Sequence, residues 1–251
     1  MEAVKVAAII QARTNSTRFP GKINQKIGNK TLLEMCIDSA KLAEEIDLVI
    51  IATTNNEDDT WIRDKFHKLN EIVVFEGDEN DVLSRFVLAA RKYNVDIITR
   101  LTSDDPFKPP WLIDKLVRKV KQNNLDYASN TLNPTFPEGL DIEVFSRNAL
   151  EKANKLSEKP SEREHVTPYI WNHPLEFRCF SEVIENDLSW ARLTVDYPSD
   201  LDRMREIWKI LGSSALSEKI LNFLQTNNYL INLAKTKILR NEGYYKSIKE
   251  D

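Results

Sequence analysis

The chain has 251 residues, of which 41% are hydrophobic and 29% charged, and its formal net charge is -4 at neutral pH. These proportions are typical of a globular protein, and the lack of a basic excess argues against a nucleic-acid partner. Because no run of about 18 apolar residues could span a bilayer, and the two cysteines suggest neither a disulfide framework nor a zinc site, we expect a cytoplasmic protein with no membrane partner.

Short apolar runs alternate with helical segments over the first hundred residues. We expect strands at 4–11, 47–54, 71–76 and 96–102, and helices at 31–43, 59–69 and 81–93. This alternation is typical of stacked βαβ units around a parallel sheet. A further helix is expected to start at Pro109-Pro110, where the missing N–H of proline costs little. The sequence therefore predicts a doubly wound α/β fold.

The pattern changes after Asn123. We expect short strands at 127–131, 140–145 and 176–184, the last two antiparallel, and helices at 161–172 and 199–211. Two more helical patterns, at 218–226 and 229–240, precede a charged tail. We therefore divide the chain into a main domain at 1–212 and a C-terminal helical appendage at 213–251, which would serve packing or oligomer formation.

The first predicted strand leads into QARTNSTRFPGK, residues 11–22, which holds Arg13, Arg18 and Lys22 and no acidic residue. Ligands of open α/β sheets bind beyond the carboxyl ends of the strands, and arginine, lysine and turn amides suit phosphate oxygens. The segment is not a Walker A loop, because Ser16 stands where that motif requires glycine. We expect an anionic ligand here, and a solvated basic loop is the alternative.

Two aspartates follow later apolar runs. Asp104, in RLTSDDPFKP, follows the strand expected at 96–102, and Asp196, in LTVDYPSDL, ends another expected strand, which is short and apolar. Carboxylate oxygens suit Mg²⁺, which completes its coordination with substrate phosphates and water. A turn-forming or capping part is the alternative for each aspartate. We expect both carboxylates at the sheet edge that carries the basic loop.

A family resemblance connects these segments. The runs IIQARTNSTRFPGK, GDENDVLSRF, RLTSDDPFKPP, YASNTLNPTFPEGLDIEVF, SEREHVTPYI and LTVDYPSDL, in this order, resemble the SpsF-type cytidylyltransferases of surface-polysaccharide biosynthesis. These enzymes are relatives of the CMP-Kdo and CMP-acylneuraminate synthetases, and the resemblance covers about residues 4–211. It implies a Rossmann-like nucleotide-diphospho-sugar transferase fold, in which helices flank a mostly parallel mixed sheet with a small antiparallel or dimerisation subregion. It also implies CMP transfer from CTP to a sugar acid or related acidic acceptor, with release of pyrophosphate, by a Mg²⁺-dependent homodimer.

The resemblance further implies parts for individual residues. Nucleotide binding would fall to Gln11, Ala12, Arg13, Ser16, Arg18, Lys22, Asp81, Arg85, Thr102 and Asp104. Catalysis would depend on Arg13, Lys22, Asp104 and Asp196, and the two aspartates would bind Mg²⁺. The acceptor would be bound by Glu138, Asp141, Arg163 and His165.

Other functions are compatible with the same residues. The fold could carry a uridylyl or guanylyl sugar-phosphate transferase, or a non-catalytic protein that binds a nucleotide sugar. His165 could bind an acceptor carboxylate or phosphate, accept its proton, or only cap or pack. The acceptor itself is not determined, because kinship of fold does not choose between a nonulosonic acid, a Kdo-like acid and a smaller acidic compound.

Overall fold

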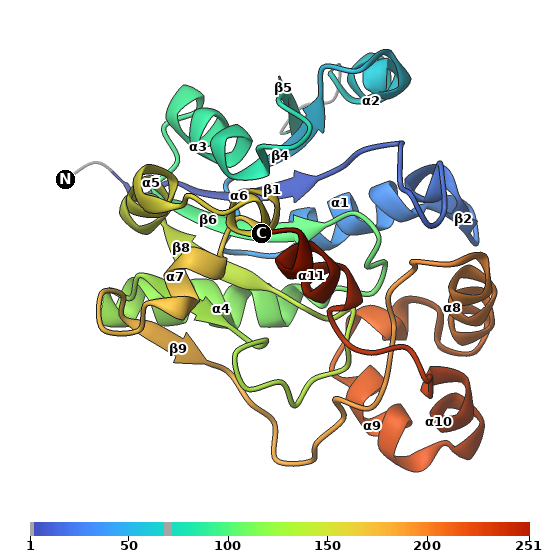
Figure 1. The fold of residues 1–251 in the computed structure, drawn as a ribbon. Helices are drawn as coiled ribbons and strands as arrows, with labels where there is room; N and C mark the ends of the chain where they lie inside the picture. The colour runs from blue at the N-terminus through green and yellow to red at the C-terminus, as the bar shows by residue number, and fades with distance from the viewer. Residues whose placement is uncertain (1–2, 68–71) are drawn as a thin grey trace.

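The computed structural model describes residues 3–67 and 72–251, and a seven-stranded sheet of order β5-β4-β1-β6-β8-β7-β9 forms its centre (Figure 1). The strands are β1 (Val6–Gln11), β4 (Leu48–Thr54), β5 (Ile72–Gly77), β6 (Ile97–Thr102), β7 (Tyr127–Ser129), β8 (Glu143–Ser146) and β9 (Cys179–Ser181). A separate antiparallel hairpin joins β2 (Lys26–Ile27) to β3 (Lys30–Thr31). The seven strands expected between residues 4 and 184 are therefore present, with bounds that differ by at most three residues. The strand expected to end at Asp196 is not formed, because the amides of Leu193 and Val195 donate to Glu138 and Asp104 instead of to a neighbouring strand.

The sheet is mixed and mostly parallel, as predicted. Strand β1 pairs in parallel with β4 and β6, and β4 pairs in parallel with β5. Strand β8 is antiparallel to β6 and β7, whereas β9 is parallel to β7. The strands expected at 140–145 and 176–184 thus run in opposite directions, but they do not pair with each other because β7 lies between them.

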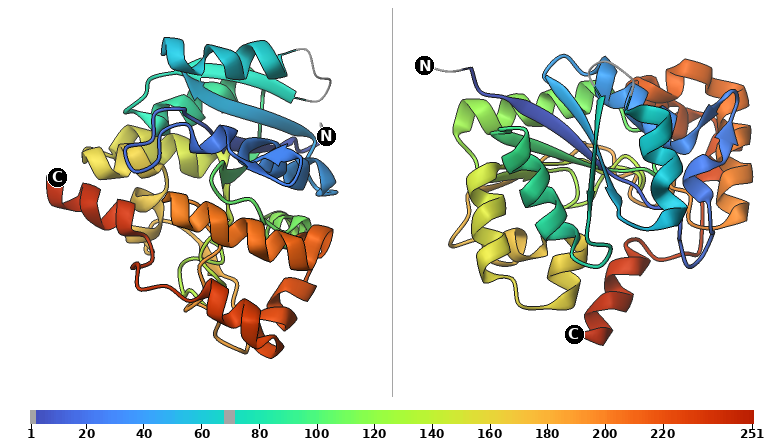
Figure 2. Two further views of the ribbon diagram at one scale, coloured as in Figure 1. Left: turned by 90° about the vertical axis from the view of Figure 1, so that its right-hand side faces the viewer. Right: turned by 90° about the horizontal axis from the view of Figure 1, so that it is seen from above.

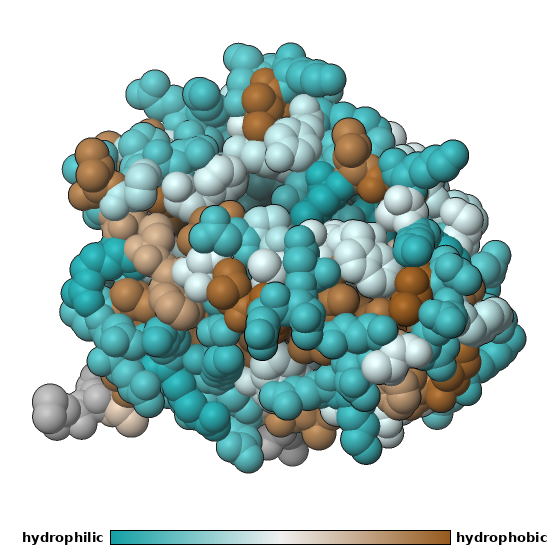
Figure 3. All heavy atoms as spheres, turned by 90° about the horizontal axis from the view of Figure 1, so that it is seen from below, coloured by the Kyte–Doolittle hydropathy of each residue, from teal (hydrophilic) through white to brown (hydrophobic). Residues whose placement is uncertain are grey.

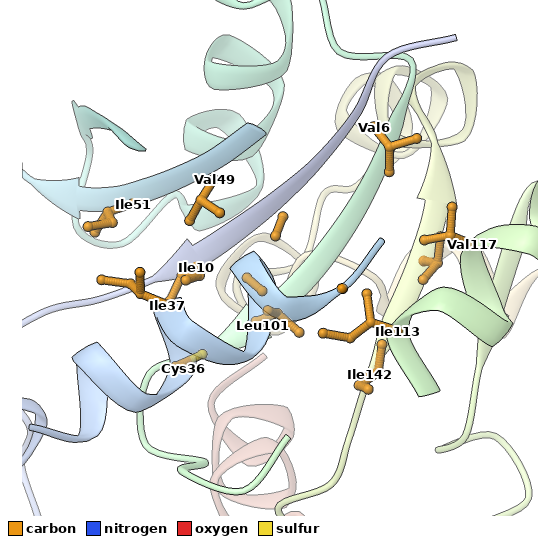
Figure 4. Packing of buried hydrophobic residues seen from close by; sticks show 14 of the residues in the cluster. Val6, Ile10, Cys36, Ile37, Val49, Ile51, Leu101, Ile113, Val117 and Ile142 are labelled. Atoms are coloured by element: carbon orange, nitrogen blue, oxygen red, sulfur yellow. The ribbon is translucent and has the colours of Figure 1, made fainter. Parts of the chain in front are cut away.

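Helices cover both faces of the sheet (Figure 2). One face carries α1 (Leu32–Leu42), α2 (Thr60–Phe66) and α4 (Pro110–Asn123), and the other α3 (Val82–Lys92), α5 (Arg147–Leu156), α6 (Pro160–His165) and α7 (Pro168–Asn172). Ala8 and Ile10 of β1 pack with α1 and α4, a cluster in which Figure 4 shows Ile10 near Leu101. Ala7 and Ile9 pack with α3 and α5. Burial of both faces explains why the strand sequences are continuously apolar.

The starts of two predicted helices are set by side-chain caps. Thr31 accepts a hydrogen bond from the amide of Glu34, whose carboxylate accepts one from the amide of Thr31, so α1 begins with a capping box. Asp81 caps α3 by accepting from the amide of Ser84 (2.9 Å). The helix expected at 59–69 is α2, which ends at Phe66 with His67 as its C-cap. Residues 68–71, which include the last two positions of that expected helix and the first of the strand expected at 71–76, lie outside the described residues.

Two segments that we predicted as single helices are divided. The segment 161–172 separates into α6 and α7 at Val166, a buried residue whose φ of 72° is left-handed. The pattern at 229–240 is helical only in α10 (Asn228–Ala234), and Lys235 then forms a β-bridge with Ala191. Both predictions were wrong in extent because the breaks depend on tertiary contacts that periodicity does not contain.

The C-terminal region packs beside the sheet. Helices α8 (Pro198–Leu211), α9 (Lys219–Thr226) and α10 share a hydrophobic cluster with Ile27, Phe107 and Leu140. The chain then returns to the sheet edge, where α11 (Glu242–Ser247) lies beside α6 (Figure 1). Short 3-10 turns complete the described elements: η1 (Lys22–Asn24), η2 (Glu57–Asp59), η3 (Gly212–Leu216) and η4 (Ile248–Glu250).

The surface seen in Figure 3 is mainly hydrophilic, and hydrophobic side chains are scattered over it in small groups. Within the described ranges, no helix combines the length and the apolar character that crossing a lipid bilayer requires.

Candidate active site

The loop after β1 turns the chain back toward the sheet edge. Gly21 has a φ of 71°, a conformation that glycine adopts without steric cost, and its amide donates to the carbonyl oxygen of Thr14 (2.8 Å). The next residue, Lys22, is buried, and its Nζ donates to Asp104 Oδ2 (2.7 Å) and to Asp196 Oδ1 (2.9 Å). The loop therefore sends one of its cations inward, to both of the predicted aspartates.

A backbone contact brings the two aspartates together. Asp104 follows β6, and the carbonyl oxygen of Asp104 accepts a hydrogen bond from the amide of Val195 (3.0 Å). Asp196 is the next residue, and the carbonyl oxygen of Val195 accepts from Lys22 Nζ (2.9 Å). The structure thus places Lys22, Asp104 and Asp196 at one edge of the sheet, where we expected them.

The pKa values of this group follow from its contacts. Burial acts to lower the pKa of Lys22, but attraction to Asp104 and Asp196 outweighs it, so the pKa of Lys22 is raised. Burial acts to raise the pKa of Asp104, but attraction and hydrogen bonding to Lys22 outweigh it and lower that pKa to about 2. Lys22 and Asp104 are therefore both charged at neutral pH.

Asp196 is bound by three cations. Its Oδ1 accepts from Arg18 Nη2 (2.5 Å) as well as from Lys22, and its Oδ2 accepts from Arg192 Nη2 (2.5 Å). The side chain of Arg192 is 1% exposed, and its other arm donates to Glu138. Asp196 therefore belongs to a buried charge network that extends from the basic loop to Glu138.

Glu138 reaches this network because two backbone segments approach closely. The amide of Glu138 donates to the carbonyl oxygen of Ala191 (3.0 Å), and the carbonyl oxygen of Glu138 accepts from the amide of Leu193 (2.7 Å). Gly139 has a φ of 95°, and a Cβ built there would lie 2.5 Å from the carbonyl carbon of Leu193. The segment PEGLDIEVF therefore needs a glycine at this position.

Two adjoining cavities open at the site. The smaller has a volume of about 260 Å³. Nine of the residues that line it were predicted to bind nucleotide: Gln11, Ala12, Arg13, Ser16, Arg18, Lys22, Arg85, Thr102 and Asp104. The larger, of about 460 Å³, has among its lining residues Glu138, Asp141, His165, Trp171, Asp196, Arg240 and Tyr244. Arg18, Thr102, Asp104 and His165 line both cavities. Two ligands could therefore meet at this boundary.

Two predicted residues line neither cavity. Asp81 and Arg163 form an ion pair with each other, 2.7 Å between Oδ2 and Nη2. Arg163 also donates to Asn154 Oδ1 (2.9 Å). The pair connects the start of α3 to α6. Both residues therefore hold these two helices together beside the cavities and do not face a ligand.

Arg13 and Arg85 are the least neutralised of the cations predicted to bind nucleotide. Arg13 is 40% exposed and lies 3.5 Å from Glu79 Oε1. Arg85 is 2% exposed and donates to the carbonyl oxygen of Asp78 (3.1 Å), while its buried Nε has no hydrogen-bond partner among the described residues. Burial and the nearby charge of Arg13 lower the pKa of Arg85 to about 10. These two side chains favour an anion in the smaller cavity.

His165 lies at the boundary as a neutral imidazole. Burial and the charge of Arg100 lower the pKa of His165 to about 4. Its Nε2 lies 2.8 Å from Ser247 Oγ, and its ring meets that of Tyr244 edge to face, with centroids 5.2 Å apart. Asp141, also predicted to bind the acceptor, accepts a hydrogen bond from Arg240, and burial raises the pKa of Asp141.

Several charged residues of the site were missed in the sequence. Arg100 in β6 donates to Gln11 Oε1 (2.9 Å) and to the Glu143 carboxylate, and Lys108, 1% exposed, donates to Asp105 Oδ2 (2.8 Å). A charged residue inside an apolar strand is a signal that could have revealed Arg100. No comparable signal marks the residues of the C-terminal tail that line the larger cavity, which are Arg240, Asn241, Glu242, Gly243, Tyr244 and Tyr245.

The aspartate pair fits a divalent metal that is shared with a substrate. Asp104 and Asp196 offer the hard oxygen ligands that Mg²⁺ prefers, and the ammonium of Lys22 shows that a cation is stabilised between them. In the described part of the chain, no group of three or more His, Cys, Asp or Glu side chains is arranged to hold a metal. Two carboxylates therefore suit an ion that takes further ligands from phosphates and water.

The sheet, with a cation-lined cavity at the carboxyl ends of its parallel strands, has the architecture of the Rossmann-like nucleotidyltransferases. A family model described as cytidylyltransferase matches residues 7–238. The chain belongs to this cytidylyltransferase family, and the match extends beyond the segments that carry the resemblance in the sequence.

Similar proteins agree with this assignment. An uncharacterized protein of Methanocaldococcus jannaschii is 37% identical over 92% of this chain and 94% of its own length. The spore coat polysaccharide biosynthesis protein SpsF of Bacillus subtilis is 34% identical over 81% of this chain and 86% of its own. The structure of a cytidylyltransferase from Leptospira borgpetersenii is 31% identical, with a TM-score of 0.85 over 94% of this chain and 99% of that one. CMP-2-keto-3-deoxy-manno-octonic acid synthetase, solved with CTP, shares the fold at 17% identity and a TM-score of 0.63, over 82% and 99% of the two chains.

Proposed function

We propose that the protein transfers CMP from CTP to a sugar acid, with release of pyrophosphate, in the biosynthesis of a surface polysaccharide. The observation that carries the proposal is the shared boundary of the two cavities, which Arg18 and Asp104 line from both sides. Membership of the cytidylyltransferase family supports CTP as the donor. The relative SpsF supports the polysaccharide pathway, and the synthetase solved with CTP supports a sugar acid as the acceptor.

In this proposal the smaller cavity binds the triphosphate. Arg13, Arg18 and Lys22 come from the loop after β1 and Arg85 lies in α3. With Arg100 of β6, these cations surround one space. Arginine can bind phosphate oxygens through two parallel hydrogen bonds, and lysine contributes a point charge. Thr102 and the backbone at Gln11 lie at the strand ends, where the rest of the nucleotide would bind.

The reaction requires charge neutralisation rather than a side-chain nucleophile. An acceptor oxygen attacks the α-phosphorus of CTP, and the bond from that phosphorus to the oxygen bridging to the β-phosphate breaks. The hydroxyl proton passes from the acceptor to solvent water, and the bridging electron pair leaves with pyrophosphate. Negative charge builds on the leaving group, so Arg13 and Lys22 would contribute by binding it more strongly in the transition state.

We infer that Mg²⁺ acts with the nucleotide, held by Asp104 and Asp196. When bound, such an ion neutralises phosphate charge and orients the triphosphate. The larger cavity would bind the acceptor through Glu138, Asp141 and His165. Arg163 would act there indirectly, through its ion pair behind the site.

Two features of organisation also remain proposals. We divide the chain into a nucleotidyltransferase domain at 1–212 and a C-terminal helical region at 213–251, which contributes to the wall of the larger cavity. A homodimer and a cytoplasmic location follow from the family resemblance, and sedimentation velocity would test the dimer.

The function is tested by measuring pyrophosphate release with CTP, UTP and GTP side by side, with Mg²⁺ and a panel of sugar acids that includes 3-deoxy-manno-octulosonate and N-acetylneuraminate. We expect release with CTP and one acid of the panel. Preference for UTP or GTP would instead support a uridylyl or guanylyl transferase. Nucleotide binding without release, whatever the acid, would support a non-catalytic binding protein.

A further inference from the structure

The C-terminal segment 241–251 lies beyond the stretch that the family model matches, 7–238, yet it borders the candidate site. Figure 1 shows it returning to the sheet edge beside α6. The amide of Asn241 donates to Glu138 Oε1 (3.0 Å), and Ser247 Oγ lies 2.8 Å from His165 Nε2. Gly243 lines both cavities. The segment is thus a wall attached to the site at several points.

Within this wall, Glu242 binds a cation of the basic loop. Its Oε2 accepts from Arg18 Nη1 (3.0 Å) and from Tyr197 Oη (3.0 Å), and its Oε1 accepts from Lys246 Nζ (2.8 Å). Hydrogen bonds from Lys246 and Tyr197 lower the pKa of Glu242 to about 2, so its carboxylate is charged at neutral pH.

The two carboxylates that bind Arg18 are held differently. Asp196, on Arg18 Nη2, is 11% exposed and belongs to the buried network with Lys22 and Arg192. Glu242, on Arg18 Nη1, is 26% exposed and comes from the terminal segment. An anion that binds Arg18 lies close to the Glu242 carboxylate, and the two negative charges repel each other. Of the two carboxylates, Glu242 is the one that can leave without unpairing a buried charge.

We propose that Glu242 is a built-in counter-ion of Arg18 that a polyphosphate ligand replaces, and that this exchange releases the Glu242 side chain from the boundary of the two cavities, while Asn241 and Ser247 keep the rest of the segment attached. Glu242 is a positioning residue: it orients Arg18 in the empty site and lowers the affinity of that site for phosphate. The inference rests on the proposed function only in naming CTP as the natural ligand.

The test is the affinity of Glu242→Gln for CTP and for inorganic tripolyphosphate, measured by titration calorimetry. An exposed ion pair is weak, so we expect Kd to fall about two- to fivefold for both ligands. Glu250→Gln is the matched control, because it removes the same charge from an exposed position on the same segment, and we expect its Kd to equal that of the wild type. In an Arg18→Ala background, Glu242→Gln loses its effect, because the contact it relieves is gone.

Two further measurements separate this inference from a merely structural role. Hydrogen exchange at the start of α11 rises when tripolyphosphate binds to the wild type. Tyr197→Phe keeps every charge but removes one hydrogen bond to Glu242, so we expect it to lower Kd by less than Glu242→Gln does. An unchanged or raised Kd in Glu242→Gln, with CTP bound normally by the wild type, overturns the inference and leaves the proposed function intact. Binding of tripolyphosphate but not of CTP overturns the proposed function alone, and binding of neither overturns both.

Discussion

The amide of Val195 donates a hydrogen bond to the carbonyl oxygen of Asp104 (3.0 Å), and this contact fixes the chain on both sides of the aspartate pair. Each of the two segments then presents one carboxylate to Lys22. Because main-chain atoms make the contact, a substitution of the Asp104 side chain leaves it in place. Changes to the charges of this group should therefore alter chemistry with the backbone arrangement retained.

Replacement of Lys22 by alanine should lower CTP-dependent pyrophosphate release by about 100-fold or more, because a cation that binds the leaving group in the transition state is lost. A coupled pyrophosphate assay measures the rate, and circular dichroism checks that the variant is folded. Lys155→Ala, at an exposed position of α5, is the control. Near wild-type turnover in Lys22→Ala would refute the assigned part.

Asp104→Asn should retain the size of the side chain and lose its charge. We expect a similar fall in rate and a higher Mg²⁺ concentration for half-maximal activity, since one of two proposed metal ligands becomes a weaker neutral donor. Rates measured over a Mg²⁺ titration test this, with Asp202→Asn, 76% exposed, as the control. An unchanged Mg²⁺ requirement would remove Asp104 from the metal site.

Gly139→Ala should destabilise the protein by about 3 kcal/mol or more, because the new Cβ would clash with the backbone of Leu193 in addition to adopting a strained φ. Gly212 also has a positive φ, of 51°, but a Cβ there meets nothing within 4 Å. Gly212→Ala should therefore cost only the backbone strain, about 1–3 kcal/mol. Urea unfolding of both variants compares them, and equal losses would show that the close approach is unimportant.

Stability should depend on pH through His165. The pKa of His165 is lowered to about 4 in the folded protein, below its usual value of about 6.5, so the unfolded state binds a proton first as the pH falls. The free energy of unfolding is therefore highest, with respect to this group, above about pH 6.5. It falls between about pH 6.5 and pH 4, by up to about 1.4 kcal/mol per pH unit. Urea unfolding measured between pH 5 and 7 gives the unfolding free energy at each pH. This free energy should change less with pH in His165→Asn than in the wild type, and an equal change in both proteins would contradict the burial effect.

The parts of the site that follow parallel strands could be predicted from the sequence. Carboxyl ends of parallel strands share one edge, so the loop with Lys22 and the aspartate after β6 were expected together, and the structure places them so. The helices expected at 31–43 and 81–93 are present, and Thr31 and Asp81, residue types that favour helix N-caps, cap them. Local chemistry and strand order were sufficient for these features.

Other parts depend on contacts that no local pattern contains. Val166 breaks a helix although valine disfavours a positive φ, and its environment must compensate. Arg192 and Glu138 are paired and buried, whereas charged residues are usually exposed, so sequence reasoning gives them no common position. Glu242 reaches Arg18 only because the chain returns from α10 to the sheet edge.

The reversed direction of β8 separates two tasks between two kinds of loop. The loops with Lys22 and Asp104 follow their strands, but residues 130–142, which carry Glu138 and Asp141, reach the same edge before β8 begins. In the proposed function, substitutions in 130–142 would therefore alter the choice of acceptor and leave the loops that bind the nucleotide unchanged. An engineer seeking a new product would vary that connection first, with Glu138 and Gly139 kept.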